Sequence, residues 1–165
     1  MPRIVITSLM LAMSLAACGS GSTPASPSVE LQKEADLYAI GQIEVRFHQA
    51  SSLKDVDLMM SLWADTATLT LVGKTYTGKD EIRGFFATVA GPFKPENNWI
   101  SETPAYKTRM TANGDKGTLY FECHYVDAHT GKVVAVVSAD QDVARINGRW
   151  LITKLVSATP ELDPY

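Results

Sequence analysis

The side chains best suited to acid–base, nucleophilic or metal chemistry are thinly spread along this chain. His48, His124 and His129 stand far apart, and no close pair of carboxylates accompanies them. Metal sites and nucleophile–base pairs need such groups close together, so the sequence predicts neither a metal nor a cofactor. Cys123 lies in an alternating apolar stretch, where a free cysteine behaves as a small buried hydrophobe. We therefore expect this thiol to be packed rather than reactive.

The other cysteine, Cys18, follows an uncharged apolar stretch at the start of the chain. Arg3 precedes the apolar run 4–17, and Ala16 and Ala17 come directly before the cysteine. A basic start, an apolar run and small residues at its end are the three regions of a secretory signal peptide. The run is shorter than the roughly 20 apolar residues that span a bilayer, so a transmembrane helix is not expected.

The order Leu15-Ala16-Ala17-Cys18 resembles a bacterial lipobox. In precursors of that kind the cysteine is acylated, with palmitate among its chains, and the signal is cut just before it. The resemblance therefore implies that residues 1–17 are a signal peptide and that acylated Cys18 holds the chain on a lipid bilayer. Because Gly19 follows the cysteine instead of an aspartate, resemblance to Gram-negative lipoproteins implies the outer membrane, facing the periplasm. A plain signal peptide or a short buried helix is the alternative.

The chain after Cys18 is about 150 residues long, enough for one domain with a hydrophobic core. Residues 18–29 are rich in glycine, serine and proline, which predicts a flexible tether behind the lipidated cysteine. The domain is expected over residues 30–158 and a C-terminal tail over 159–165. The formal net charge is −3 and lysine and arginine form no cluster, so no nucleic-acid partner is expected. Once Cys18 is acylated, Cys123 cannot form an intramolecular disulfide.

The first half of the predicted domain has the apolar periodicity of helices. A first helix is expected over residues 30–50. A second, capped by Asp55, is expected to run through Val56 and Trp63, and a third to begin at Lys79. The apolar positions that recur at helical intervals are Leu37, Ile40, Ile43 and Phe47, then Met59 and Met60, then Ile82, Phe85, Phe86 and Val89.

The second half has the pattern of a sheet. Helices followed by a meander of strands indicate an α+β fold, with three N-terminal helices packed on a curved antiparallel sheet. Such a cone has a central hollow between its layers, and aromatic-lined hollows are common ligand sites. The predicted strands cover residues 67–72, 75–77, 106–111, 117–126, 132–146 and 150–157, with turns at Asn113-Gly114-Asp115 and Asn147-Gly148.

Three stretches of the domain carry a family resemblance. They are Leu62-Trp63-Ala64-Asp65-Thr66-Ala67-Thr68-Leu69, the run from Tyr76 to Phe86, and Arg145-Ile146-Asn147-Gly148-Arg149-Trp150-Leu151-Ile152. In this order they resemble the SnoaL-like branch of the nuclear-transport-factor-2-like superfamily, over most of the domain. The resemblance implies the cone fold and, because many relatives dimerise through the outer sheet face, a homodimer. It does not imply one activity, since the superfamily contains isomerases, dehydratases, cyclases and binding proteins.

The catalytic positions of these relatives are mostly occupied here by other residue types. By resemblance to the ketosteroid-isomerase-like members, the base aspartate falls on Leu71 and the oxyanion-side tyrosine on Phe47. Neither side chain can exchange a proton. The third polar position falls on Asp142 and is present. The aspartate of dehydratase-like members falls near Ser52, and no histidine pair accompanies it. The comparison predicts a retained pocket with different chemistry or none.

Alternation along the strands sorts the remaining side chains. One face of the strand over 117–126 carries the apolar set that matches the pocket-facing set of the relatives, namely Leu119, Phe121, Cys123 and Tyr125. The other face carries Tyr120, Glu122 and His124, which we expect to meet solvent or a second subunit. We also expect His48 at the surface.

Asp142 is the candidate acid. If it faces the hollow, burial among aromatic rings raises its pKa and makes it a proton or hydrogen-bond donor. The alternative is that Asp140 and Asp142 flank Gln141 on a solvated strand.

We predict a lipid-anchored protein that binds a small apolar ligand or a protein partner without catalysis. The alternative is an enzyme of the isomerase, dehydratase or cyclase type that uses Asp142 with Tyr125 in acid–base chemistry. A third reading is a structural role in the cell envelope through the outer sheet face. The candidate ligand-binding residues are Phe47, Trp63, Phe85, Phe86, Trp99, Phe121, Tyr125 and Asp142.

Overall fold

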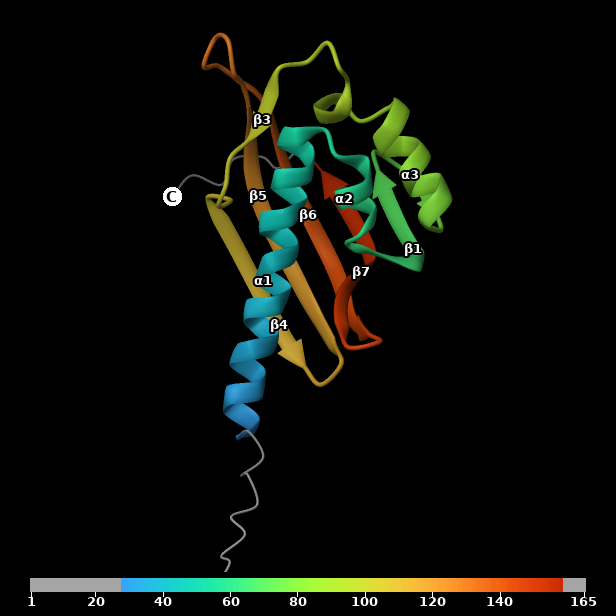
Figure 1. The fold of residues 1–165 in the computed structure, drawn as a ribbon, viewed down its shortest axis with the longest axis vertical. Helices are drawn as coiled ribbons and strands as arrows, with labels where there is room; N and C mark the ends of the chain where they lie inside the picture. Colours follow the sequence, from blue (N-terminus) through green and yellow to red (C-terminus); the bar gives the residue numbers. More distant parts are fainter. Residues whose placement is uncertain (1–27, 159–165) are drawn as a thin grey trace, which may run out of the picture.

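A long first helix crosses one face of a seven-stranded sheet in the computed structural model, which describes residues 28–158 (Figure 1). This helix, α1 (Val29–Leu53), begins where the Ser28 side chain accepts a hydrogen bond from the Leu31 amide. The predicted signal peptide, acylated Cys18 and C-terminal tail lie outside the described residues. Within residues 28–158 no helix combines the length and the apolar character that crossing a membrane requires.

Two further helices, α2 (Val56–Met60) and α3 (Lys79–Thr88), and the short 3-10 turn η1 (Gly91–Phe93) complete the helical layer. The predicted cap of α2 is confirmed, because the Asp55 side chain accepts a hydrogen bond from the Leu58 amide at 2.8 Å. The prediction that α2 continues through Trp63 was wrong. Trp63 starts the next strand instead, because its backbone pairs with Ile152 at the far end of the chain.

The sheet has the order β2-β1-β7-β6-β5-β3, and β4 also pairs with β5. The α+β prediction is confirmed, with helices on one face of a curved sheet (Figure 1). One detail differs from the expected all-antiparallel sheet: β1 and β7 pair in parallel, because the chain returns to β1 only after building the rest of the sheet. The strands are β1 (Trp63–Leu71), β2 (Lys74–Thr77), β3 (Trp99–Ser101), β4 (Lys107–Asn113), β5 (Lys116–Asp127), β6 (Val133–Ile146) and β7 (Arg149–Ala158).

The core is densely filled where the middle of α1 crosses the sheet. Ile40 and Leu119 are fully buried there, and Ile43 is nearly so. Near the C-terminal end of α1 the side chains are mainly aromatic and pack edge to face around Phe47. The closely packed half fixes the helix on the sheet, and the aromatic half is where a hollow remains.

Among the glycines of the described residues, Gly117, near the start of β5, is the one with the closest neighbouring atom. A Cβ atom at this position would lie 2.4 Å from the Thr111 carbonyl oxygen and 2.9 Å from Ile40 Cδ1. We expect Gly117→Ala to lower the free energy of unfolding by about 1–3 kcal/mol, as overpacking does. Gly84→Ala, in α3, meets nothing within 4 Å, and we expect it to raise stability by about 0.5–1 kcal/mol. Urea denaturation of both variants checks this, and equal stability of the two would contradict the close approach.

Candidate functional site

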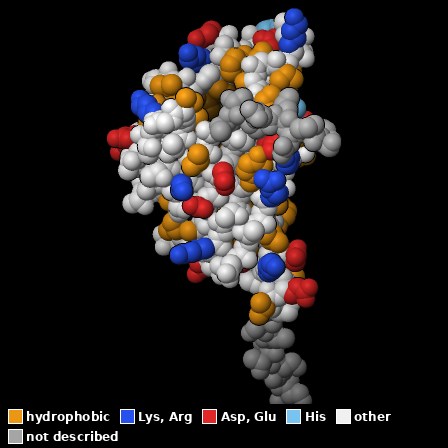
Figure 2. Space-filling view, turned by 180° about the vertical axis from the view of Figure 1, so that it is seen from behind, with side chains coloured by type: hydrophobic (Ala, Val, Ile, Leu, Met, Phe, Trp, Pro, Cys, Tyr) orange, Lys and Arg blue, Asp and Glu red, His pale blue; other side chains and the backbone are white. Residues whose placement is uncertain are grey.

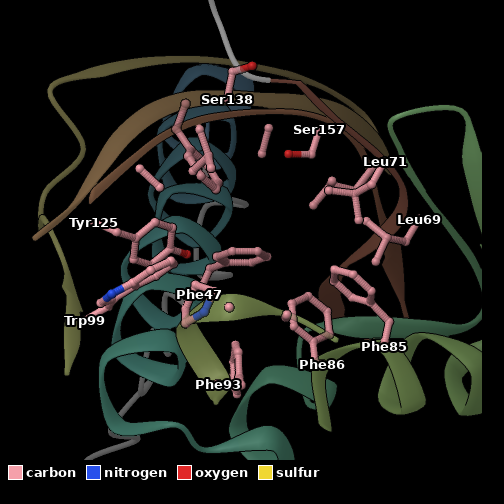
Figure 3. A pocket seen from close by; sticks show the side chains of 18 residues that line it. Phe47, Leu69, Leu71, Phe85, Phe86, Phe93, Trp99, Tyr125, Ser138 and Ser157 are labelled. Carbon is pink, nitrogen blue, oxygen red and sulfur yellow. The ribbon is translucent and has the colours of Figure 1, made fainter. Parts of the chain in front are cut away.

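A cavity of about 210 Å³ lies between the sheet and the helices at the end of the domain where α1 terminates (Figure 3). Figure 2 shows hydrophobic side chains gathered around a hollow at the upper end of the face seen from behind. The lining side chains from residues 28–158 include no charged group. They are Phe47, Leu69, Leu71, Phe85, Phe86, Ala90, Gly91, Pro92, Phe93, Trp99, Phe121, Tyr125, Ala135, Val137, Ser138, Ala139, Leu155 and Ser157.

Aromatic rings from several elements form one side of this cavity. Phe47 comes from α1, Phe86 from α3 and Phe121 from β5, and the Phe47 ring centroid lies 6.1 Å from that of Phe86 and 5.5 Å from that of Phe121. Each pair meets edge to face, which is a favourable arrangement for aromatic rings. Of the eight side chains proposed from the sequence, these six line the cavity: Phe47, Phe85, Phe86, Trp99, Phe121 and Tyr125.

The other two proposed residues lie elsewhere. Trp63 is fully buried in the core behind the cavity, where its ring packs against Phe86 at 6.0 Å. Asp142 is on the outer face of β6, with 58% of its side chain exposed and Oδ2 4.0 Å from Lys154 Nζ. Asp142 therefore does not line the hollow, and the neighbouring Gln141 points inward instead. An acid role for Asp142 requires that this side chain faces the hollow, and it faces solvent instead.

Several lining residues were not anticipated from the sequence. Leu69 on β1, Val137 and Ala139 on β6, and Phe93 of η1 all face the cavity. Alternation along β6 points to Val137 and Ala139, but only once the strand is known to lie beside Phe121 and Cys123 of β5. Phe93 follows a Gly-Pro sequence and belongs to no periodic pattern, so the sequence carries little signal for it.

Tyr125 brings a hydroxyl group to the cavity. Its oxygen lies 3.3 Å from Ser51 Oγ, and Ser51 in turn donates a hydrogen bond to the Phe47 carbonyl at 3.0 Å. Burial raises the pKa of the Tyr125 phenol well above its usual value, with the nearby Cys123 thiol adding to the effect. The phenol is therefore neutral at physiological pH and acts as a hydrogen-bonding group rather than a base.

His48 and Glu44 form a buried pair on α1 that the sequence did not reveal. His48 was expected at the surface, but it is fully buried and its ring packs on Phe121 at 4.8 Å. Its Nδ1 atom lies 2.8 Å from Glu44 Oε1, which also accepts a hydrogen bond from the Ala105 amide at 2.7 Å. Burial raises the Glu44 pKa, but the bonds from His48 and Ala105 outweigh it and the net pKa is lowered. The pair joins α1 to the segment before β4 and supports the cavity wall from behind.

The thiol of Cys123 is buried, as expected. Burial raises its pKa to about 12, and the Ser101 hydroxyl lies 3.9 Å from its sulfur. A thiol with such a pKa is protonated at neutral pH and is a poor nucleophile. Within residues 28–158 no group of histidine, cysteine, aspartate and glutamate side chains is arranged to hold a metal ion.

The outer face of β5 carries a buried carboxylate. Glu122 is only 4% exposed, because Tyr106, Tyr120 and Lys107 surround it. The hydrogen bond from Tyr120, followed by those from Tyr106 and Lys107, lowers the pKa of Glu122 to about 2 against the opposing effect of burial. Glu122 lies on the outer face, as expected. Its carboxylate is not exposed, however, because it is hydrogen-bonded by other side chains of the same chain.

The geometry of the cavity supports binding better than proton transfer. The positions that resemble the isomerase base and tyrosine, Leu71 and Phe47, both line it. Neither carries an ionisable group, and the candidate acid Asp142 faces solvent. Tyr125 supplies a hydrogen bond, but its raised pKa keeps the phenol protonated, so it does not act as a general base at neutral pH.

These features define an α+β cone with an apolar pocket, and sequence comparison places it in a family. The SnoaL-like domain family profile matches residues 45–151, more than half of the 165-residue chain. The chain therefore belongs to the SnoaL-like domain family. No curated protein sequence matches it.

Solved structures share the fold at low sequence identity. A nuclear-transport-factor-2-like protein with a cystatin-like fold from Novosphingobium aromaticivorans has a TM-score of 0.70 and 15% identity, covering 81% of this chain and 88% of its own. A protein of unknown function from Nostoc punctiforme has a TM-score of 0.66 and 19% identity, covering 79% and 95%. A protein from Streptomyces avermitilis, described as a proposed dehydratase of the same superfamily, has a TM-score of 0.63 and 15% identity, covering 77% and 97%. Identities this low establish the fold and not the activity.

Proposed function

We propose that this protein is an exported, lipid-anchored binding protein that holds a neutral, largely apolar small molecule without transforming it. The observation that carries the proposal is the cavity of about 210 Å³. The side chains from residues 28–158 that line it are mainly aromatic and aliphatic, and none is charged. Burying an unpaired charge in such surroundings is strongly unfavourable, so carboxylates, phosphates and amines are poor ligands. A small uncharged molecule that leaves water gains roughly 25 cal/mol per Å² of buried apolar area.

Native mass spectrometry of the full-length lipoprotein, released gently from membranes, tests this proposal first. A bound mass that is lost on denaturation supports the binding function, and its composition identifies the ligand class. Incubation with that ligand then separates binding from catalysis, because an enzyme changes the ligand mass and a binding protein returns it unchanged. Release of a chemically altered molecule would support the isomerase, dehydratase or cyclase alternative.

A pair of variants on β6 connects binding to the cavity. Ala139 lines the cavity and is 3% exposed, whereas Asp142 on the same strand faces outward. We expect Ala139→Phe to fill the cavity and weaken binding of the neutral dye N-phenyl-1-naphthylamine by about 10-fold or more. Asp142→Phe adds the same ring outside and is expected to change binding by less than about 2-fold. Ala135→Phe, at a half-buried lining position, repeats the test if the first variant is poorly folded.

The described chain enters α1 at Val29, and the cavity lies near the other end of this helix. The helix rises about 1.5 Å per residue, so Phe47 is about 27 Å along it from Val29. A chain tethered through acylated Cys18 to the outer membrane enters the domain at Val29, which leaves the cavity end free to take a ligand from the periplasm. Cys18→Ser is expected to move the protein from the membrane fraction to the soluble fraction, and unchanged fractionation would refute the lipid anchor.

The outer sheet face is the surface on which we propose a homodimer. Arg109 stacks on the Tyr120 ring at 4.2 Å, and His124 stacks on Tyr106 at 4.7 Å, which gives this face a preorganised set of aromatic and charged side chains. Side chains of these types are common at subunit interfaces. The native mass spectra report the subunit number directly, and a monomer at micromolar concentration would refute the dimer.

A further inference from the structure

The polar end of the cavity has a defined direction of hydrogen bonding. Ser51 has one hydroxyl proton, which it donates to the Phe47 carbonyl at 3.0 Å. Its oxygen therefore accepts from Tyr125, whose hydroxyl lies 3.3 Å away. A phenol has one proton and two acceptor lone pairs, and the Ser101 side chain also hydrogen-bonds this hydroxyl. The Tyr125 oxygen therefore has acceptor capacity for one further donor. Each bond in such a chain polarises the next and strengthens the terminal acceptor.

The location of the Tyr125 hydroxyl group is consistent with a role in ligand selection. Tyr125 lines the cavity and is 4% exposed, and Ser51 behind it is 1% exposed. Figure 3 shows the Tyr125 ring beside Trp99, with its oxygen toward the cavity interior, whereas the Ser138 oxygen points away from it and Ser157 lies on another side. A ligand with a donor gains one hydrogen bond to this oxygen, which a ligand of the same shape without a donor cannot make.

We propose that Tyr125 selects neutral alcohols or phenols, whose hydroxyl group donates a hydrogen bond to the Tyr125 oxygen while the apolar body of the ligand lies against Phe47 and Phe86. This inference rests on the proposed binding function and names the chemical class of ligand. The uncharged lining from the described residues excludes ammonium donors, because their desolvation is not compensated. An ether or a hydrocarbon of the same shape fits the cavity but donates no hydrogen bond to the Tyr125 oxygen.

Three matched probes test the inference: 2-naphthol donates a hydrogen bond, 2-methoxynaphthalene only accepts one, and 2-methylnaphthalene does neither. They compete with N-phenyl-1-naphthylamine on the mature chain, residues 18–165, carrying Cys18→Ser so that no lipid or detergent occupies the cavity. We expect wild-type binding of 2-naphthol to be about 3- to 10-fold tighter than that of 2-methylnaphthalene, the usual net effect of one hydrogen bond. In Tyr125→Phe the ratio is expected to fall within about 2-fold while 2-methylnaphthalene binds unchanged.

A second variant tests the direction of the hydrogen bonds. In the double variant Ser51→Ala with Ser101→Ala, the Tyr125 proton loses both neighbouring hydroxyl groups and turns toward the cavity. Binding of 2-methoxynaphthalene is then expected to tighten relative to 2-naphthol by about 3-fold or more. Tyr38→Phe, at a tyrosine on α1 that is 71% exposed, is the matched control and leaves every ratio unchanged. Circular dichroism and thermal melts confirm that each variant is folded.

The outcomes separate this inference from the function on which it rests. If the dye fails to bind the wild-type protein, the binding function and the inference both fall. If all three probes bind alike in wild type and Tyr125→Phe, the binding function stands and the selection by Tyr125 is overturned. Preference for 2-methoxynaphthalene in the wild type overturns the assigned donor direction.

Discussion

Phe121→Ala is expected to lower the free energy of unfolding by about 3–5 kcal/mol, the range for removing a buried phenylalanine ring. Phe121 is fully buried, and its ring packs against Phe47 at 5.5 Å and His48 at 4.8 Å. Both partners belong to α1, which Ile40, Ile43 and Ala50 also hold on the sheet through their buried side chains. The structure therefore cannot collapse into the vacated space, which joins the existing cavity. Guanidinium unfolding followed by tryptophan fluorescence measures the loss.

The matched control is Phe85→Ala, because Phe85 lines the same cavity but is only half-buried. We expect this second variant to lose clearly less stability, since less apolar area returns to water. The enlarged cavity of Phe121→Ala should also accept bulkier neutral ligands, and a bound ligand then restores part of the lost stability. A loss below about 1 kcal/mol in Phe121→Ala would show that the ring is not a supporting wall of the cavity.

The elements that the sequence predicts well are those specified by local interactions. The Asp55 cap, the helical periodicity of α1 and the Asn147-Gly148 turn each depend on residues a few positions apart. Asn147 and Gly148 both adopt positive φ, 51° and 76°, as a tight hairpin turn between β6 and β7 requires. The aromatic lining was also predictable, because helical spacing and strand alternation both direct these rings to the same layer.

What the sequence missed depends on long-range register. Alternation alone does not say which of Gln141 and Asp142 faces inward, since that is set by the pairing of β6 with β5 and β7. Gln141 lies opposite Leu119 and Leu155, both on the inner face, so Asp142 is forced outward. The burial of His48 has a similar cause, because its partner Glu44 is satisfied by Ala105, 61 positions away along the chain.

The second large expected effect is on the pH dependence of folding stability, and it comes from Glu122 on the outer face of the sheet. The hydrogen bond from Tyr120 is the main cause that lowers its pKa from 4.5 to about 2, with Tyr106 at 2.7 Å and Lys107 at 3.1 Å contributing further. In the unfolded chain the same carboxyl titrates near 4.5, so between pH 4.5 and pH 2 the unfolded state binds more protons. The contribution of Glu122 to folding stability is therefore fully present above pH 4.5. It is lost progressively as the pH falls from 4.5 to 2. Hydrogen bonds to a charged group contribute about 1.5–3 kcal/mol, and we expect a pH-dependent contribution of this order.

Glu122→Gln isolates this contribution from that of other carboxyls with lowered pKa values, such as Asp36 and Glu44. The difference in unfolding free energy between wild type and Glu122→Gln is expected to be largest at pH 7 and to shrink between pH 4.5 and pH 2, as measured by urea denaturation across that range. Glu96→Gln, at an exposed position, controls for the change in net charge. A difference that is independent of pH would mean that the Glu122 carboxylate is not stabilised by Tyr120, Tyr106 and Lys107 in its charged form. The proposal that the outer face is a preorganised surface for a homodimer would then lose its support.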